Sequence, residues 1–572
     1  MKKLDIQIEN HPRDRVEVIL PDGMAISAPR GTAIGTILSV LEGSQIAPIM
    51  GAVINGDLRE LTYPINMDAK VIPVTMEDAD GARIYRRSVT FLLEAAFEEL
   101  YPDEIMTVDH SVASGGFFCQ ISGGKVLTEL ELDALEDRMQ AYVDADVPFE
   151  RSQVPLEKAI AFFEQNGQTD KVRLLKYRQK DHLVLYKLGR HQDYHHGYMV
   201  PSTGCLKWFE LTAVGQGFVL RYPRRSSPTK LLPMPSYPKL LATFRQYGDW
   251  LTRLGIDSVG ALNDAIIEGR IREVILVSEA LHEHQIAEIA ERIARRAKET
   301  RIILIAGPSS SGKTTFSKRL AVQLLVQGIS PYPIELDNYF VDREQTPKDE
   351  DGQYDFESLG ALNTGLLAEH LSRLTAGDEV QLPKYDFKAG KSGMGDVARI
   401  STDQILILEG IHGLNPKLLP TISSQQTFKI YVSCLTQLNL DRQNRISTTD
   451  SRLLRRIVRD ARERGYSALQ TLQRWESVRK GEKQHIFPFQ ENADEMFNSA
   501  TVFELAALKE FAEPLLRQTP HGTMEYIEAK RLLAFLQWFL PIDTSLIPDN
   551  SIVREFIGGS ILREFKIWKN GN

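Results

Sequence analysis

A stretch rich in glycine, serine and threonine in the second half of the chain has the spacing of a phosphate-binding loop. Residues 307–314 follow the pattern G-x-x-x-x-G-K-T, after an apolar run typical of a buried strand and before a helical pattern at 316–325. Glycines let backbone N–H groups surround phosphate oxygens, and the following helix presents the positive end of its dipole. In this motif, a P-loop, Lys313 reaches the β- and γ-phosphates and the Thr314 hydroxyl can ligate Mg²⁺. The motif predicts binding of a nucleoside triphosphate by Gly307, Pro308, Ser309, Ser310, Ser311, Gly312, Lys313, Thr314 and Thr315.

Two carboxylates follow apolar runs that are typical of parallel strands. Residues 332–336 lead into Asp337, and residues 405–408 lead into Glu409, the Walker B position. Residues 428–432 have the pattern of a third parallel strand. Because ligands bind at the carboxyl ends of strands in open parallel sheets, Asp337 and Glu409 are expected to face the phosphates.

An arginine-rich helical segment follows the third strand, at 452–465. Phosphoryl transfer needs cations around the migrating group and a carboxylate near the attacking hydroxyl. Arg456, Arg459 and Arg464 occur where a P-loop kinase carries the lid over its phosphates. The alternatives are a solvated helix or an RNA-binding patch, and the position after the third strand favours the lid.

Several segments together resemble the uridine kinase branch of the phosphoribulokinase/uridine kinase family, over about residues 300–518. They are the P-loop, residues 336–337, 354–356, 383–387 and 408–410, and the arginine run. The resemblance implies a doubly wound parallel-sheet P-loop kinase that uses ATP and Mg²⁺. It implies that Asp337 takes the proton from a sugar 5′-hydroxyl, with Lys313 and the three arginines as further catalytic residues. Thr314 and Glu409 would hold Mg²⁺. The substrate contacts it implies are Tyr354, Glu357 at the ribose hydroxyls, and Tyr385 and Phe387 beside the base.

The residues that read the base in uridine kinases differ in this sequence. Gly390 stands at the position of a histidine, Tyr466 at that of a lid arginine, and Arg474 at that of a glutamine. The phosphoryl-transfer residues are present and the base-reading set is not. The residues therefore predict kinase activity more firmly than they predict the acceptor. The resemblance implies a nucleoside such as uridine or cytidine, and another small alcohol is the alternative acceptor.

The first part of the chain has a different character. Strand-like runs, two turns and a short helix that Thr32 could cap give a ββαββ order within residues 16–74. This order resembles the TGS domain, a β-grasp module at the front of threonyl-tRNA synthetases. The helical segment 81–100 and the segment 193–201 resemble the second additional domain of those synthetases. Its four metal or catalytic positions read Arg87, Phe91, His195 and Met199 here, so an editing hydrolase is disfavoured.

Two polar clusters in this part of the chain are expected to have a structural role without a ligand. His191, His195 and His196 are expected to form a polar, partly exposed loop, with a metal site as the disfavoured alternative because no recognisable set of acidic and cysteine ligands accompanies them. A group of six arginines is interpreted as solvated charge on a helix face and a linker, and an RNA-facing patch is the alternative. These arginines are Arg83, Arg86, Arg87, Arg221, Arg224 and Arg225. An RNA-binding regulator that uses ATP as a switch is therefore a second hypothesis for the whole chain.

Length and composition fit a multidomain protein without membrane segments. The 572 residues, 42% hydrophobic and 25% charged, predict three to five domains. The net charge of −8 argues against a protein that coats nucleic acid. Three widely spaced cysteines, a start without an apolar signal core and the lack of any long apolar run predict a cytoplasmic protein. The kinase resemblance implies a small-molecule substrate. The oligomeric state is left open.

The chain is expected to divide at composition changes. Five prolines between residues 223 and 238 mark a linker. A helix to about residue 298 follows, with Ser278 as its expected cap. The residues expected on its apolar face are Ile286, Ile289, Ala290, Ile293, Ala294 and Ala297. The expected parts are a TGS-like β-grasp domain (1–76), a synthetase-like α+β domain (77–222), a linker and helical connector (223–298), the kinase domain (299–518) and a C-terminal helical extension (519–572).

Overall fold

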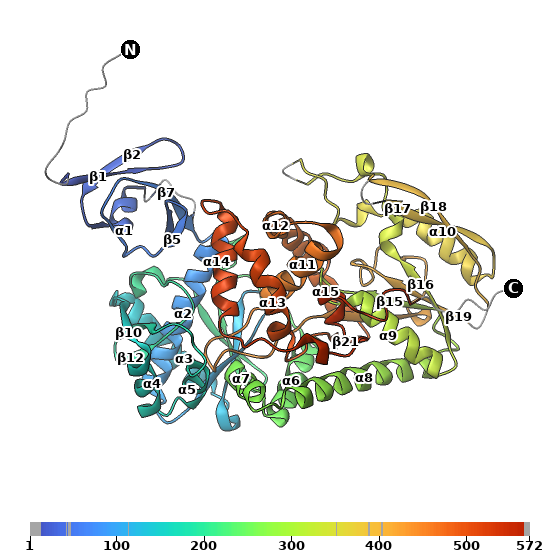
Figure 1. The fold of residues 1–572 in the computed structure, drawn as a ribbon, viewed down its shortest axis with the longest axis horizontal. Coiled ribbons are helices and arrows are strands. Elements are labelled where there is room, and N and C mark those ends of the chain that lie inside the picture. Colours follow the sequence, from blue (N-terminus) through green and yellow to red (C-terminus); the bar gives the residue numbers. More distant parts are fainter. Residues whose placement is uncertain are drawn as a thin grey trace, which may run out of the picture. The chain divides into compact units, whose positions relative to one another are not determined.

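The structure, a computed structural model, describes residues 13–41, 43, 47–112, 114–349, 352–386, 389–401 and 404–565. Phe387 lies outside these described residues. The chain divides into two compact units (Figure 1). Unit 1 comprises Met1–Pro235, Asp441–Arg445 and Pro520–Arg531, and unit 2 comprises Ser236–Leu440, Ile446–Thr519 and Leu532–Asn572.

Unit 1 begins with a β-grasp sheet. Its strand order is β2-β1-β7-β4-β5, in which β1 pairs in parallel with β7 and the other pairs are antiparallel. The strands are β1 (Arg15–Ile19), β2 (Ala25–Pro29), β4 (Ile49–Ile54), β5 (Asp57–Arg59) and β7 (Ala69–Thr75). Alternate residues of β1, Val16 and Val18, are buried against the short helix α1 (Ile34–Leu38), as the period of a half-buried strand requires.

The predicted cap of α1 is wrong. Thr32 lies in the short strand β3 (Thr32–Ala33), which pairs with β6 (Pro64–Ile65), and its hydroxyl donates to the Pro29 carbonyl oxygen at 2.7 Å. Ala33 is the residue before the helix and provides no side-chain cap. Thr32, whose side chain would suit a helix cap, is therefore part of a strand and does not cap α1.

The rest of unit 1 packs helices on two antiparallel sheets. Helix α2 (Ala79–Leu100) is buried along most of its length and shares a core with α3 (Glu129–Asp144) and with the sheet β13-β14-β9-β8. That sheet is formed by β8 (Met106–Ser111), β9 (Gly116–Ile121), β13 (Glu210–Val214) and β14 (Gly217–Arg221). The other sheet and its helices are β10 (Glu150–Pro155), β11 (His182–Leu188), β12 (His191–Asp193), α4 (Leu156–Gln165) and α5 (Thr169–Leu175).

Unit 2 begins with three helices: α6 (Pro238–Leu254), α7 (Val259–Ile267) and α8 (Ile271–Arg295). Pro238 occupies the first turn of α6, where its missing N–H costs no hydrogen bond. The predicted apolar face of α8 is confirmed for Ile286, Ile289, Ala290 and Ile293, which are buried. Ala294 is half-buried, and Ala297 lies beyond the end of the helix. The predicted cap is wrong, because Ser278 lies inside α8 and its hydroxyl donates to the Val274 carbonyl oxygen at 2.7 Å.

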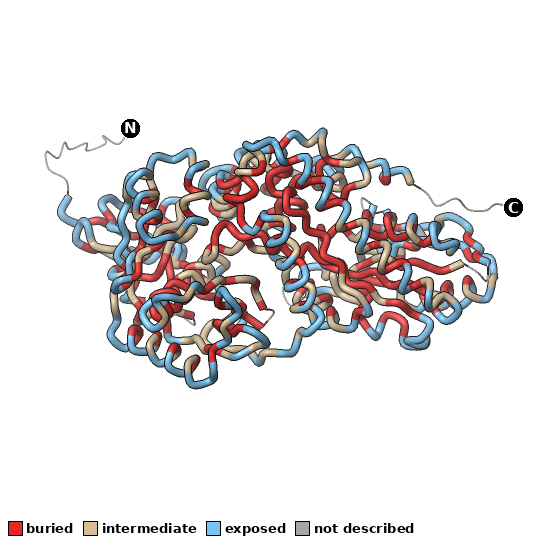
Figure 2. Tube along the Cα trace, turned by 90° about the horizontal axis from the view of Figure 1, so that it is seen from below, coloured by how far each residue is buried: buried red, intermediate tan, exposed pale blue. Residues whose placement is uncertain are grey.

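A fully parallel sheet forms the centre of unit 2, in the order β16-β19-β15-β20-β21. Its strands are β15 (Ile302–Ala306), β16 (Ser330–Glu335), β19 (Gln404–Glu409), β20 (Thr427–Ser433) and β21 (Glu495–Asn498). Every residue of β15 is buried, as expected of a central strand covered on both faces. In Figure 2 buried stretches, drawn in red, lie in the interior, and exposed stretches, drawn in pale blue, lie on the outside.

The other elements of unit 2 surround this sheet. They are α9 (Lys313–Val326), a 3₁₀ turn at Leu336–Tyr339, α10 (Thr364–Thr375), the hairpin β17 (Val380–Asp386) and β18 (Lys391–Ala398), α11 (Thr448–Arg464), α12 (Ala468–His485) and α13 (Glu504–Arg517). Helix α14 (Met524–Leu536), whose residues up to Arg531 belong to unit 1, and the short α15 (Arg554–Ile557) follow. Among the described residues, no helix combines the length and the apolar character needed to cross a membrane.

Candidate functional site

The P-loop connects the central strand β15 to helix α9. Gly312, the residue before α9, has a φ of +82°, in the left-handed region that glycine adopts without strain. A Cβ at this position would lie 2.6 Å from Cγ2 of Ile552, so a larger residue would also collide with the C-terminal segment. Backbone conformation and packing together therefore require glycine here.

Buried arginines of α11 hold the carbonyl oxygens of the loop. Arg452 donates to the Ser309 carbonyl oxygen at 3.0 Å, and Arg455 donates to the Ser310 carbonyl oxygen at 3.4 Å. Both guanidinium groups are paired with buried carboxylates, Arg452 with Glu482 and Arg455 with Glu504. Glu482 also accepts a hydrogen bond from the Ser309 N–H at 3.1 Å. The loop is thus fixed from the side of α11 and α12 before any phosphate binds.

Thr314 and Glu409 lie in direct contact. The Thr314 hydroxyl donates to Oε2 of Glu409 at 3.1 Å, because β15 and β19 are parallel neighbours that end at the same edge of the sheet. Burial raises the pKa of Glu409 to about 7; Lys313 opposes this shift, whereas Asp337 and Glu335 add to it. An excess of carboxylates around a hydroxyl is a donor set that suits Mg²⁺, which prefers oxygen ligands. The predicted Mg²⁺ residues therefore fit that ion.

Asp337 lies just past β16, at the same edge of the sheet. Its side chain remains accessible to solvent, yet surrounding protein raises its pKa, an effect that the positive charges of Lys313, Arg464 and Arg459 oppose. The carboxylate is therefore close to the cations that the sequence assigned to the phosphates. A carboxylate with a raised pKa is a better proton acceptor than one in free solution.

The three predicted lid arginines converge on one buried carboxylate, Asp460. Arg456, Arg459 and Arg464 lie 3.3, 3.1 and 3.4 Å from its oxygens. Arg456 also donates to the Ser309 hydroxyl at 2.7 Å, so it directly links α11 to the P-loop. Asp460 holds the guanidinium groups as a group beside the loop, a role that the sequence analysis did not identify.

The predicted substrate residues occupy different surroundings. Burial raises the pKa of Glu357 to about 7, with Glu482 and Asp337 adding to the shift and Arg456 and Lys313 opposing it, so this carboxyl group lies near the P-loop. Tyr385 is buried against Phe340 at 5.5 Å between ring centroids. Tyr354 is more exposed and packs against Phe356 at 6.1 Å.

The Glu357 carboxyl group gives an expected pH dependence. Because its pKa is raised, it is neutral below about pH 7 and charged above it, and a charged carboxylate accepts stronger hydrogen bonds from sugar hydroxyls. We expect KM for the acceptor to rise several-fold between pH 8 and pH 6, and this change to disappear in Glu357→Gln. Steady-state kinetics across this range, with the exposed Glu379→Gln as control, would check it. A KM change that persists in Glu357→Gln contradicts the assignment.

Two further carboxylates contact the P-loop region without any signature in the local sequence. Glu482 comes from α12, and Glu555 comes from the C-terminal segment, where its Oε2 accepts from the Thr315 hydroxyl at 2.7 Å. Neither residue stands in a local motif, so only the folded chain reveals them. The only indication in the sequence would be a charged residue on the apolar face of a helix, as Glu482 is on α12.

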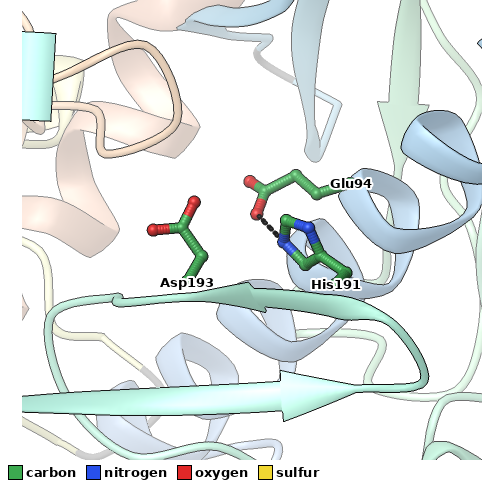
Figure 3. A group of neighbouring side chains, drawn as sticks. All are labelled: Glu94, His191 and Asp193. Carbon is green, nitrogen blue, oxygen red and sulfur yellow. Dashed lines mark ion pairs between the residues drawn. The ribbon is translucent and has the colours of Figure 1, made fainter. Parts of the chain in front are cut away.

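The histidine cluster of unit 1 is buried, so its interpretation as a partly exposed polar loop is wrong. Nε2 of His195 lies 3.0 Å from Oε2 of Glu94, and His191 contacts both Glu94 and Glu98. The acidic partners, which the sequence seemed to lack, come from helix α2. Figure 3 shows Glu94, His191 and Asp193, whose ligand atoms lie within 4.8 Å of one another. Asp193 also pairs with the buried Lys171, so ion pairs inside the protein account for this donor set.

This network is expected to make the stability of unit 1 depend on pH. Burial alone would lower the pKa of His191, but hydrogen bonds to Glu94 and Glu98 raise it to about 9. A raised histidine pKa contributes stability that is complete below its unfolded value and is lost as the pH rises towards 9. We expect His191→Gln to cost about 3 kcal/mol at pH 6 and little at pH 9.5. Urea denaturation at both pH values would measure this, with the more exposed His182→Gln as control. A pH-independent loss would contradict it.

At least four of the six arginines considered for an RNA patch make contacts within unit 1, and for Arg83, Arg87 and Arg221, which are largely buried, the interpretation as solvated charge is wrong. Arg83 pairs with Asp80 at 2.8 Å and with Glu528 at 2.9 Å. Arg87 donates to the Tyr198 carbonyl oxygen, Arg221 pairs with Glu210, and Arg225 donates to the Glu77 carbonyl oxygen. These guanidinium groups hold the unit together.

Comparison with known proteins finds different relatives for the two parts of the chain. A profile of the Phosphoribulokinase / Uridine kinase family matches residues 302–506, and the P-loop kinase fold with a parallel sheet is confirmed. This match supports an ATP-dependent kinase of a small alcohol. A solved structure of a possible uridine kinase from Bacillus stearothermophilus has 19% identity and a TM-score of 0.25, and the match covers 37% of this chain and 100% of that one.

The N-terminal region is similar to threonine–tRNA ligases, as predicted. The enzyme of Clostridium kluyveri is 30% identical over 204 residues, 36% of this chain and 32% of the ligase. That of Halorhodospira halophila is 33% identical over 204 residues, 35% of this chain and 31% of the ligase. The chain thus spans about a third of the length of the curated relatives that it matches.

Proposed function

We propose that the protein is a kinase that transfers the γ-phosphoryl group of ATP to the 5′-hydroxyl of a nucleoside. The observation that carries the proposal is the meeting of three groups at one edge of the parallel sheet. They are the P-loop with Lys313, the carboxylates Asp337 and Glu409, and the arginines gathered on Asp460. The family match over residues 302–506 supports the reaction class.

In this proposal each group has one task. The P-loop amides and Lys313 bind the triphosphate, and Arg456, Arg459 and Arg464 stabilise charge that develops on the migrating group. Asp337 accepts the proton of the acceptor hydroxyl as it attacks. Mg²⁺, held by Thr314 and Glu409, would neutralise phosphate charge.

The acceptor is the open part of the proposal. Gly390, Tyr466 and Arg474 replace the residues that read the base in uridine kinases. Arg474 lies over the ring of Tyr466, 4.5 Å from its centroid, so the two side chains are engaged with each other. Another small alcohol is therefore the alternative acceptor.

A panel of nucleosides, sugars and other small alcohols, each with ATP and Mg²⁺, tests the proposal by ADP release. We expect at least one nucleoside to give turnover, with the product phosphorylated at the 5′-position by mass spectrometry and NMR. Turnover with a non-nucleoside alcohol alone would support the alternative acceptor. ATP hydrolysis that no acceptor stimulates would contradict both. An RNA-binding regulator is not favoured, since Arg83, Arg87, Arg221 and Arg225 are engaged inside unit 1.

A further inference from the structure

The C-terminal tail, residues 547–565, packs against the two helices that flank the P-loop. Ile552, Val553 and Phe556 are buried, and the Arg455 guanidinium lies 4.9 Å from the centroid of the Phe556 ring. Lys318 of α9 donates to the Leu562 carbonyl oxygen at 2.7 Å, and Arg462 of α11 donates to the Glu555 carbonyl oxygen at 2.8 Å. The backbone around Glu555 is therefore held from both sides.

The Glu555 side chain reaches the first turn of α9. Its Oε2 accepts from the Thr315 hydroxyl at 2.7 Å and from the Thr315 N–H at 3.3 Å. The first N–H groups of a helix have no acceptor within the helix, and in a P-loop these groups are donors to phosphate. The Glu555 carboxylate thus accepts hydrogen bonds from Thr315 at the N-terminus of the phosphate-binding helix.

The contact between Glu555 and Thr315 caps α9 and also competes with phosphate for the same N–H group. Gly312, the residue before α9, has no side chain with which to cap the helix, so the cap comes from a residue 240 positions away in the sequence. A carboxylate at a helix N-terminus stabilises the helix, but where that terminus binds phosphate the same contact competes with the ligand. The charge of Glu555 also reaches Glu409, whose pKa it helps to raise. The phosphate-binding end of α9 therefore carries one negative charge more than the P-loop motif requires.

We propose that Glu555 sets the affinity of the P-loop for nucleotide phosphates, because its carboxylate holds the Thr315 donors when no nucleotide is bound. Phosphate binding then requires the side chain to rotate away, while the anchored tail backbone stays in place. The inference rests on the proposed function, since it concerns the same nucleotide site. It makes Glu555 a residue that weakens nucleotide binding in the natural protein.

Nucleotide binding to the full chain without any acceptor tests the inference. Calorimetry would give Kd for ADP and for ATP with Mg²⁺ in the natural protein and in Glu555→Gln. The glutamine keeps an oxygen that accepts from the Thr315 hydroxyl, so the end of α9 keeps a partner. Loss of a charge-assisted contact that competes with phosphate is expected to lower Kd about tenfold. Glu555→Asp, whose shorter side chain cannot reach Thr315, is expected to lower Kd in the same direction.

The matched control is Glu564→Gln, which removes the same charge from an exposed position of the tail. It is expected to leave Kd unchanged. An unchanged or higher Kd in both Glu555 variants would overturn the inference, and so would an equal tightening in Glu564→Gln, which would indicate a general effect of tail charge. A natural protein that binds neither nucleotide would instead refute the proposed function, so the two failures are distinguishable.

Discussion

Replacing Asp337 by asparagine is expected to lower kcat about a thousandfold while Kd for ATP stays within about twofold. The amide has nearly the same size as the carboxylate but cannot accept the proton of the attacking hydroxyl. Asp337 lies among Lys313, Arg459 and Arg464, at the sheet edge that carries the P-loop. The loss should therefore appear in the chemical step and leave nucleotide binding intact.

The measurement is ADP release at saturating acceptor, with ATP binding measured separately by calorimetry. Asp378→Asn, an exposed loop residue of the same unit, is the control and should retain full turnover. Loss of ATP binding in Asp337→Asn would assign the residue to the nucleotide site instead. Unchanged turnover would remove it from the mechanism altogether.

The Arg452–Glu482 pair is expected to give the second large effect. Both side chains are almost completely buried, and the pair contacts the N–H and the carbonyl oxygen of Ser309 in the P-loop. Arg452→Met leaves Glu482 buried with Arg479 as its remaining ion-pair partner, at 3.2 Å. Removing one partner of a buried pair typically costs about 3–5 kcal/mol, and the remaining partner places the expected loss near 3 kcal/mol.

The same substitution should raise Kd for ATP at least tenfold, because Ser309 loses the donor that positions the loop. Urea denaturation and calorimetry would measure the two effects. In the double variant Arg452→Met/Glu482→Met we expect stability to recover, since no buried charge is left alone, but not nucleotide affinity. Arg517→Met, which breaks an exposed pair on α13, is the control. Full affinity in the Arg452→Met variant would show that the pair does not position the loop.

Local sequence patterns were sufficient for most elements of the kinase domain. The G-x-x-x-x-G-K-T motif, the apolar runs before Asp337 and Glu409, and the arginine helix follow from short-range rules: apolar strands, a glycine turn and a helical period. The structure places these residues at one sheet edge because parallel strands end on the same side. The roles of the individual site residues remain predictions that the proposed variants test.

Expectations failed where a side chain had a choice of partners. Thr32 and Ser278 have side chains that suit helix caps, but Thr32 lies in a paired strand and Ser278 lies inside α8. The histidines of residues 191–196 seemed to lack acidic partners because Glu94 and Glu98 lie about a hundred residues earlier, one helical turn apart on α2. A polar side chain is satisfied by the nearest group in space, and sequence distance does not reveal which group that is.

The residues on which the proposed kinase chemistry rests can be recognised without a structure, since a P-loop, two strand-end carboxylates and an arginine helix are local features of fixed spacing. The contacts around these residues appear only in the folded chain. Asp460 gathers the arginines, Glu482 fixes the loop, and Glu555 reaches Thr315 across 240 residues of sequence. Such contacts depend on which helix packs where, and burial of apolar faces over the whole unit determines that packing.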